Sequence, residues 1–264
     1  MRDSVERLRK DWEVLAADDP YWAVLSRADK RGGGWDPAAF FETGRRDVDQ
    51  MLDHLTHLGV DVGRQRALDF GCGVGRMAQA LADSFEAVDG VDIAEGMVVR
   101  ARELNRHGDR CRYYQNVLPD LSLFPNETFN LVHSTITLQH IPRPLALGYI
   151  AEFVRVVKPT GVVVFDVPAT SANPLRQVLR RITPRVLLRA RFRRRYRVFA
   201  YMDMNPISRS RVTAHLASMG LDVLDTEQST SAGVSWPGFR YYSRKPPLDK
   251  GLVPPQLDPK LQPE

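Results

Sequence analysis

The sequence contains little cysteine and no long hydrophobic run. Its 264 residues include only Cys72 and Cys111, which argues against a disulfide framework and favours a reducing cytoplasm. Apolar stretches such as residues 161–167 are far shorter than a membrane span, and residues 1–13 carry charges of both signs instead of a signal peptide's apolar region. Neither a metal-type spacing of cysteine and histidine nor an internal repeat occurs. We therefore expect a cytoplasmic globular protein with no transmembrane segment, and we predict no metal ligand.

Acidic residues are absent from residues 176–197, which hold ten arginines. Removing these ten positive charges from the net charge of +5 leaves −5 for the rest of the chain, so the basicity is local. Three interpretations are open: a solvated helix face, a site for an anionic substrate or carrier, or a surface for nucleic acid or an anionic membrane. Few aromatic residues accompany the arginines, namely Phe192, Tyr196 and Phe199, which disfavours a nucleic-acid partner.

What the chain does contain is an alternation of strand-like and helix-like segments. Hydrophobic residues make up 43% of it, enough for a full core. The alternation predicts an α/β fold with a mostly parallel sheet covered by helices on both faces. The predicted strands are residues 66–70, 86–93, 111–117, 128–136, 159–168, 221–228 and 239–245. Helices are predicted over residues 3–17, 38–60, 76 onward, 94–107, 143–158 and 209–220, with Asp36 capping the second of them and Pro37 at its first position.

The organisation along the chain suggests five regions. The changes of pattern predict an N-terminal helical cap at 1–60, a cofactor-binding core at 61–170, a basic helical insert at 171–206, the C-terminal part of the core sheet at 207–245 and a loose proline-rich tail at 246–264.

A glycine-rich turn follows the first predicted strand. Glycine allows a tight bend and a close approach of ligand to backbone, and the following helix offers free N–H groups. The dinucleotide fingerprint would need glycine at position 76, where this chain has arginine; the turn carries Asp69, Gly71, Gly73 and Gly75 instead. An acidic residue before the first glycine would repel a pyrophosphate but suits an ammonium group.

A second acidic residue, Asp92, ends the next predicted strand. A carboxylate at that position can accept hydrogen bonds from both hydroxyls of a ribose. Together the two sites predict a ligand with a ribose, an ammonium and a carboxylate but no phosphate. S-adenosylmethionine meets that description. The alternative is that Asp69 and Asp92 only cap local turns, which leaves their combined spacing unexplained.

From about Ala67 to Val167 the sequence resembles the class I S-adenosylmethionine-dependent methyltransferases. The motifs that carry the resemblance are LDFGCGVGR, GVDIAEGMVVRARE, YYQNVLPDLSLFPNETFNLVHSTITLQHI and VVKPTGVVVFDVP, in that order. The resemblance implies a three-layer, Rossmann-like sheet of seven strands, with one strand of the last hairpin antiparallel. It also implies S-adenosylmethionine as cofactor.

The resemblance also implies residue roles. Asp69 would meet the methionine ammonium through water or backbone, Asp92 and Ile93 would hold the ribose and flank the adenine, and Ser134 would lie near the reactive methyl. Many relatives place an acidic residue after the third strand, whereas this chain has Asn116. The full set of expected cofactor-binding residues is Asp69, Gly71, Cys72, Gly73, Gly75, Asp92, Ile93, Met97, Asn116, Val117, Ser134 and Arg45.

The predicted catalytic group is His140, just past the fourth strand. An imidazole titrates near neutrality and could take a proton from a hydroxyl acceptor, although a purely structural role in the loop is an equal alternative. His133, within the strand, is expected to pack or to bond to backbone. Gln139, Trp22 and Trp236 are candidate substrate contacts, with ordinary packing as the alternative for the tryptophans.

The acceptor is expected to be a small molecule. The sequence HSTI stands where enzymes that methylate exocyclic base amines often carry an Asn/Asp-Pro-Pro-aromatic motif, which argues against nucleobases. The N-terminal segment, the helix after Pro37 and the basic insert are placed to form a lid. We therefore predict transfer of a methyl group to an oxygen of a small molecule, a sugar or secondary metabolite, with an anionic or carrier-linked acceptor as one option. RNA or protein methylation, and a non-catalytic cofactor-binding regulator, are the alternatives, and the sequence indicates no oligomeric state.

Overall fold

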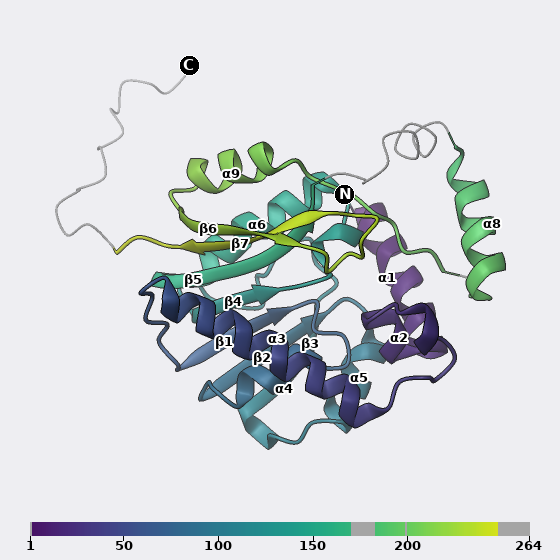
Figure 1. Ribbon diagram of the computed structural model, residues 1–264, viewed down its shortest axis with the longest axis horizontal. Coiled ribbons are helices and arrows are strands. Elements are labelled where there is room, and N and C mark those ends of the chain that lie inside the picture. Colours follow the sequence, from purple (N-terminus) through teal and green to yellow (C-terminus); the bar gives the residue numbers. More distant parts are fainter. Residues whose placement is uncertain (1, 170–182, 199, 248–264) are drawn as a thin grey trace, which may run out of the picture.

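The computed structural model describes residues 2–169, 183–198 and 200–247 (Figure 1). Within these residues a seven-stranded sheet runs in the order β3-β2-β1-β4-β5-β7-β6. The strands are β1 (Arg66–Phe70), β2 (Ala87–Asp92), β3 (Cys111–Gln115), β4 (Phe129–Ser134), β5 (Val157–Pro168), β6 (Asp222–Ser229) and β7 (Gly238–Arg244).

The first five strands are mutually parallel, and β7 is antiparallel to both of its neighbours. Each strand predicted from the sequence is present, and the predicted fold class is confirmed. Because the strand order reverses between β1 and β4, the connections after these two strands leave in opposite directions and open a crevice at their carboxyl ends.

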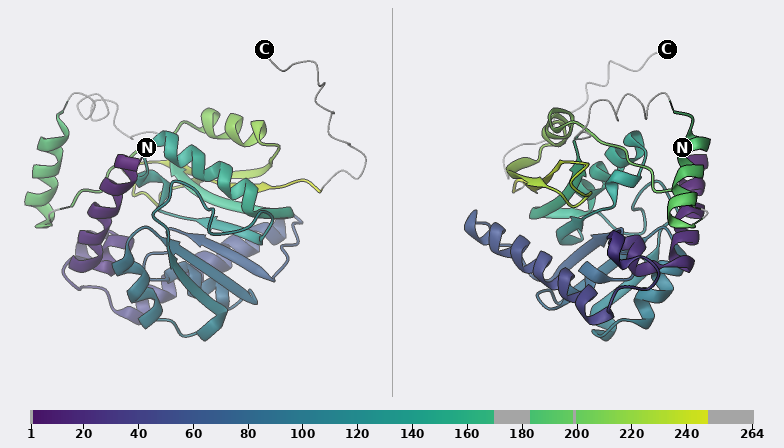
Figure 2. Two further views of the ribbon diagram at one scale, coloured as in Figure 1. Left: turned by 180° about the vertical axis from the view of Figure 1, so that it is seen from behind. Right: turned by 45° about the vertical axis from the view of Figure 1, so that its right-hand side comes forward.

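Helices cover both faces of the sheet (Figures 1 and 2). On one face, apolar side chains of α3 (Pro37–His57), α4 (Arg76–Ala82) and α5 (Glu95–Glu103) pack with alternate strand residues such as Ala67 and Val164. On the other face, α6 (Arg143–Val156) and α9 (Arg209–Ser218) pack with Leu68 and Val163. Successive strand residues enter opposite cores, as the two-residue period of a strand requires.

Helix α3 begins where the sequence predicts. Asp36 accepts a hydrogen bond from the backbone of Ala39, and Pro37 is the first helical residue. Helix α3 packs on a face of the sheet and not over the crevice. Residues 1–60, expected to form one N-terminal cap, are therefore divided between the crevice and this face. Arg76, which stands where the dinucleotide fingerprint has glycine, is 2% exposed and pairs with Asp47 of α3 at 2.6 Å. That ion pair ties α3 to the helix that follows the glycine turn.

The rest of the N-terminal region lies over the carboxyl ends of the strands. Helices α1 (Arg2–Asp18) and α2 (Pro20–Val24) contribute Leu15, Trp22 and Ala23 to a third apolar cluster, which also holds Met97 of α5. Helix α8 (Arg185–Tyr196), from the basic segment, packs against the same cluster. Residues 170–182 of the predicted insert and all but the first two residues of the predicted tail lie outside the described part of the chain.

The fifth strand starts earlier than the sequence indicates. β5 begins at Val157, but its pairing with β4 jumps from Val157 to Val162, and Thr160 between them has a φ of 63°. The residues between these two pairs therefore form an irregularity inside the strand. No helix within the described ranges combines the length and apolar character needed to cross a membrane.

Candidate active site

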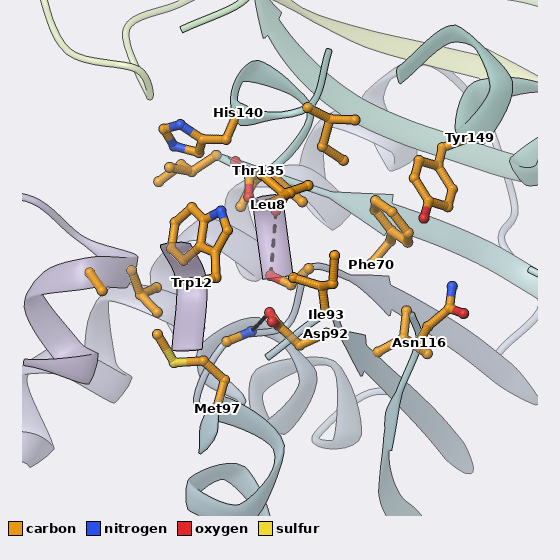
Figure 3. Close-up of a pocket in the computed structure, with 18 residues that line it drawn as sticks. Leu8, Trp12, Phe70, Asp92, Ile93, Met97, Asn116, Thr135, His140 and Tyr149 are labelled. Atoms are coloured by element: carbon orange, nitrogen blue, oxygen red, sulfur yellow. Dashed lines mark hydrogen bonds between the residues drawn. The ribbon is translucent and has the colours of Figure 1, made fainter. Parts of the chain in front are cut away.

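A cavity that opens to solvent lies at the carboxyl ends of β1, β2 and β4 (Figure 3). Its floor is formed by residues at the ends of these strands or directly after them, including Phe70, Gly71 and Asp92. Leu8 and Trp12 of α1 form the opposite wall, together with Ala23 and Val24 of α2. The cavity therefore lies between the sheet and the two N-terminal helices, which supports the expectation that the N-terminal segment covers the site.

The glycine turn adopts a conformation that favours glycine. Gly71, Gly73 and Gly75 have φ values of 76°, 52° and 86°, in the left-handed region. A Cβ on Gly71 would lie 2.2 Å from the side chain of Thr137, and one on Gly73 would lie 2.5 Å from Val24. Gly71 and Gly73 line the cavity, so a ligand there meets backbone and not side chains.

Asp92 joins the glycine turn to the start of α5. Its two carboxylate oxygens accept hydrogen bonds from the backbone N–H groups of Gly73 and Ala94, each at 2.9 Å. The carboxyl is half-buried and lines the cavity, and the loss of solvent raises its pKa from the ordinary value of 3.8 to about 6. Each oxygen keeps a further lone pair, so the carboxylate can also accept from two neighbouring hydroxyls. The capping contact and the ribose contact predicted from the sequence are therefore compatible.

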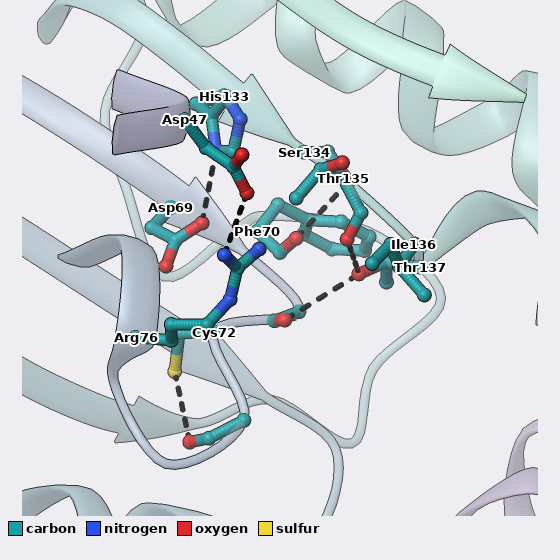
Figure 4. A network of polar contacts seen from close by, with 12 residues as sticks. Asp47, Asp69, Phe70, Cys72, Arg76, His133, Ser134, Thr135, Ile136 and Thr137 are labelled. Atoms are coloured by element: carbon teal, nitrogen blue, oxygen red, sulfur yellow. Dashed lines mark hydrogen bonds and ion pairs between the residues drawn. The ribbon is translucent and has the colours of Figure 1, made fainter. Parts of the chain in front are cut away.

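Asp69 lies on the opposite side of β1 from the cavity (Figure 4). Phe70 faces the cavity, and side chains alternate along a strand, so the carboxyl of Asp69 points the other way. One of its oxygens lies 3.2 Å from Nδ1 of His133, and the other has no hydrogen-bond partner among the described residues. A direct contact of this carboxyl with a ligand in the cavity is excluded by its position, and a role through the backbone of the turn stays a prediction.

Ile93 and Asn116, which the resemblance places beside the adenine, line the cavity together with Met97, whereas Val117, the other residue expected at the adenine edge, does not. The side chain of Asn116 is engaged in its own loop, because its amide donates to the carbonyl of Asp120 and accepts from Leu118 N–H. Asn116 therefore shapes the wall.

His140 lines the cavity from the turn that follows β4. Its Nδ1 lies 2.7 Å from the carbonyl oxygen of Asp203, which can only accept, so Nδ1 carries the proton. In the neutral ring the lone pair is then on Nε2, to which the amide of Gln139 donates over 3.0 Å. The indole of Trp12 meets the imidazole edge to face, with ring centroids 5.2 Å apart. The arrangement holds one ring orientation and one tautomer.

The loop between β4 and His140 is set by a buried carboxylate that the sequence analysis did not single out. Asp166 of β5 accepts from the hydroxyl of Thr135 at 2.7 Å and from the backbone of Ile136 at 3.0 Å. Ile136 has a φ of 58°, a strained value for a β-branched residue. Thr135, Ile136 and Thr137 line the cavity, whereas the expected Ser134 donates to the carbonyl of Phe70.

Several residues expected at the site have other surroundings. Trp22 is 1% exposed, donates from its indole to the carbonyl of Arg27 and packs on Tyr196, so its contacts are those of the core. Arg45 is exposed on α3 and pairs with Glu42 and Asp83. The expected residues that do not line the cavity are Asp69, Cys72, Gly75, Val117, Ser134, Arg45, Trp22, Gln139 and Trp236.

Among the described residues, one group of side chains has metal-ligand character, and it lies away from the cavity. His54 of α3 contacts Asp225 through Nε2 at 2.9 Å and Glu227 through Nδ1 at 3.3 Å. The two carboxylates thus lie at different nitrogens of one ring. This is the geometry of an imidazole held between two carboxylates and not of ligands converging on one ion.

Comparison with known proteins identifies the domain. The profile of the methyltransferase domain family matches residues 67–161. The chain is 29% identical over 205 residues to a ubiquinone biosynthesis O-methyltransferase of Neisseria meningitidis, covering 74% of this chain and 79% of the relative. It is 31% identical over 137 residues to a demethylmenaquinone methyltransferase of Tropheryma whipplei, covering 49% and 54%.

The fold is likewise that of known methyltransferases. The magnesium protoporphyrin IX methyltransferase of Synechocystis PCC 6803, solved with bound SAH, superimposes with a TM-score of 0.64 at 16% identity, over 92% of this chain and 100% of the other. The glycine turn and Asp92 lie at the strand ends, where such a sheet binds its ligands, and the contact of Asp92 with a ribose stays a prediction. Residues 67–161 therefore match the methyltransferase domain family, and the chain shares its fold with solved methyltransferases.

Proposed function

We propose that the enzyme transfers a methyl group to a hydroxyl oxygen of a small, uncharged and largely apolar molecule, with His140 as the general base. The observation that carries the proposal is the tautomer of His140. Its Nδ1 is held by the carbonyl of Asp203, and its Nε2 is the basic nitrogen of a side chain that lines the cavity. A base at this place suits a hydroxyl acceptor, whose oxygen becomes a good nucleophile only as its proton is removed.

The walls of the cavity favour an apolar acceptor. Asp92 is the only carboxylate among them, and no lysine or arginine side chain lines the space within the described part of the chain. Leu8, Trp12, Val24 and Ile141 form the part of the lining nearest to α1, α2 and the turn of His140. These groups would bury an aromatic or aliphatic body, whereas a sugar would find few hydrogen-bond partners there.

The reaction needs little from the protein besides orientation and a proton acceptor. When bound, S-adenosylmethionine supplies a methyl carbon activated by its sulfonium. The cofactor would be held at Gly71, Gly73 and Asp92; its methyl carbon would bond to the acceptor oxygen, while its sulfur would keep the electron pair of the broken carbon–sulfur bond. Nε2 of His140 takes the hydroxyl proton. To reach Nε2, the hydroxyl takes the place of the Gln139 amide. Trp12 and Leu8 keep water from the reacting atoms.

The relatives support an oxygen acceptor of small size. The Neisseria protein is named an O-methyltransferase of ubiquinone biosynthesis, and it aligns over three quarters of this chain. We infer an acceptor of comparable chemistry, a hydroxylated aromatic ring, which a secondary metabolite would also offer. Neither relative is named for action on RNA or protein.

The test is a methyl-transfer assay with labelled cofactor and catechol as the probe acceptor. His140→Ala should lower kcat about 10²- to 10⁴-fold while cofactor affinity, measured by calorimetry, changes little. His215→Ala removes a half-buried histidine whose Nε2 contacts the carbonyl of Leu147 on α6, and it serves as the matched control. If His140→Ala keeps turnover within a few-fold of the control, the imidazole is structural and the proposed mechanism fails.

A further inference from the structure

The helix α8 carries a charge pattern that the methyl transfer does not use. Five arginines on this helix or directly after it are exposed, and the whole of residues 183–198 contains no acidic residue. The exposed arginines are Arg191, Arg193, Arg194, Arg195 and Arg197. A helix face of one sign on a body whose remaining charge is negative attracts anionic partners.

The opposite face of α8 fixes the helix to the rest of the enzyme. Phe192 and Tyr196 pack on the apolar cluster beneath, and the rings of Tyr196 and Trp22 lie 5.0 Å apart. Arg189 pairs with Asp11 of α1 at 2.7 Å. In Figure 2 the two helices lie side by side in both views. The arginine face is therefore presented on a supported helix, one helix away from the cavity that α1 lines.

Three of the arginines border one hollow. Arg193, Arg194 and Arg197 line a shallow hollow on α8, and Ala190 is the small residue between them. Arg197 has a φ of 55°, which ends the helix there. The hollow is thus bordered by positive side chains, and the planar N–H forks of arginine match the oxygens of a phosphate.

The exposed residues in the first turn of α8 indicate which kind of molecule carries the phosphate. Val186 is 76% exposed and Leu187 is 59% exposed, immediately before the arginines. Apolar side chains next to exposed arginines are typical of a helix that lies in the interface of a bilayer. Nucleic acid would instead use exposed aromatic rings, but Phe192 and Tyr196 are turned inward.

We propose that α8 docks the enzyme on an anionic lipid bilayer. A headgroup phosphate occupies the hollow between Arg193, Arg194 and Arg197, and Val186 and Leu187 enter the boundary between headgroups and acyl chains. This docking is independent of the acceptor, so it stands or falls separately from the methyl-transfer proposal.

The experiment is sedimentation of the full chain with vesicles of phosphatidylcholine alone or of phosphatidylcholine mixed equally with phosphatidylglycerol. Binding is expected to the mixed vesicles only. The triple variant Arg193→Gln, Arg194→Gln, Arg197→Gln should weaken it on the order of a hundredfold at low salt, since one surface arginine accounts for about fivefold. The double variant Val186→Ser, Leu187→Ser should weaken it about tenfold.

The control removes the same charge elsewhere. A second triple variant deletes three exposed arginines on α3 and α5, by Arg45→Gln, Arg46→Gln and Arg100→Gln. It should change vesicle binding much less than the α8 triple variant. Equal losses of vesicle binding in both triple variants would show that binding depends only on the net charge of the protein, and would overturn the proposal. So would binding to neutral vesicles, or binding of a single-stranded RNA without binding to mixed vesicles. Thermal stabilisation by inorganic phosphate, together with vesicle binding unchanged by Val186→Ser, Leu187→Ser, would point to a soluble phosphate ligand and also contradict docking.

Discussion

Replacing Asp92 by asparagine should weaken cofactor binding and stabilise the cofactor-free protein at the same time. The carboxyl lines the cavity, accepts from Gly73 and Ala94, and has a pKa raised to about 6 by the loss of solvent. Its ionised form is therefore less favourable in the folded chain than in water. Asparagine keeps the shape and one acceptor oxygen but has no charge.

The stability change follows from the pKa. A rise from 3.8 to about 6 corresponds to roughly 3 kcal/mol at about 1.36 kcal/mol per unit, and water in the open cavity makes this an upper bound. The NH₂ group of asparagine faces a backbone N–H that the carboxylate oxygen accepted from, so one hydrogen bond is lost. This loss lowers the free energy of unfolding by about 1 kcal/mol. We expect Asp92→Asn to raise the free energy of unfolding by about 1 to 2 kcal/mol at neutral pH.

The sign of the pH dependence is fixed by the direction of the shift. A carboxyl whose pKa is raised on folding binds more protons when folded, so its unfavourable contribution is complete above pH 6 and disappears as the pH falls to about 4. The stability advantage of Asp92→Asn should therefore shrink over this range. Urea denaturation of both proteins without cofactor at several pH values measures it.

The binding change has the opposite sign. Two hydrogen bonds from ribose hydroxyls to a carboxylate, each contributing about 1.5 to 3 kcal/mol, become one bond to a neutral amide oxygen of about 1 kcal/mol. Allowing for partial compensation by water, the loss is about 2 kcal/mol, or roughly 30-fold in Kd. Calorimetry with S-adenosylhomocysteine measures this directly.

The control is Asp89→Asn on the same strand. Asp89 is fully buried and pairs with Arg66 at 2.6 Å, away from the cavity, so its replacement should lower stability and leave cofactor affinity within about twofold. If Asp92→Asn instead lowers stability and leaves affinity unchanged, Asp92 is a local cap and the ribose assignment is refuted.

Three further substitutions test the walls of the site. Gly71→Ala places a Cβ 2.2 Å from Thr137 at a left-handed φ, and it should cost about 1 to 3 kcal/mol of stability, partly restored by adding Thr137→Gly, as urea denaturation would show. Trp12→Ala should raise the KM for the acceptor about tenfold or more, because the indole packs on His140 and closes the cavity; an unchanged KM would place the acceptor elsewhere. Asp166→Asn should lower kcat with little change in S-adenosylhomocysteine affinity, because Asp166 holds Thr135 and Ile136; equal losses in both would indicate general unfolding.

The sequence by itself determined the sheet, the glycine turn and the place of Asp92 at the end of its strand. Each rests on a pattern within a short segment: β-branched runs that alternate with helices, glycines that alone accept the left-handed turn, and an acidic residue at a strand end. Such patterns are local, so the structure they predict depends little on contacts with distant parts of the chain. The parallel order of the strands also places the carboxyl ends of β1, β2 and β4 at one edge of the sheet. This arrangement can be predicted without knowing any side-chain contact.

Only the tertiary structure decided which side chains reach the cavity. The helical pattern of residues 3–17 predicted a helix, but it did not show that Leu8 and Trp12 would form a wall of the site. The tautomer of His140 depends on the carbonyl of Asp203, 63 residues away, and the loop before it depends on Asp166. These are contacts between segments distant along the chain, and their partners are chosen by packing and not by any local preference. For the same reason the carboxyl of Asp69 lies on the side of β1 away from the cavity, where it contacts His133.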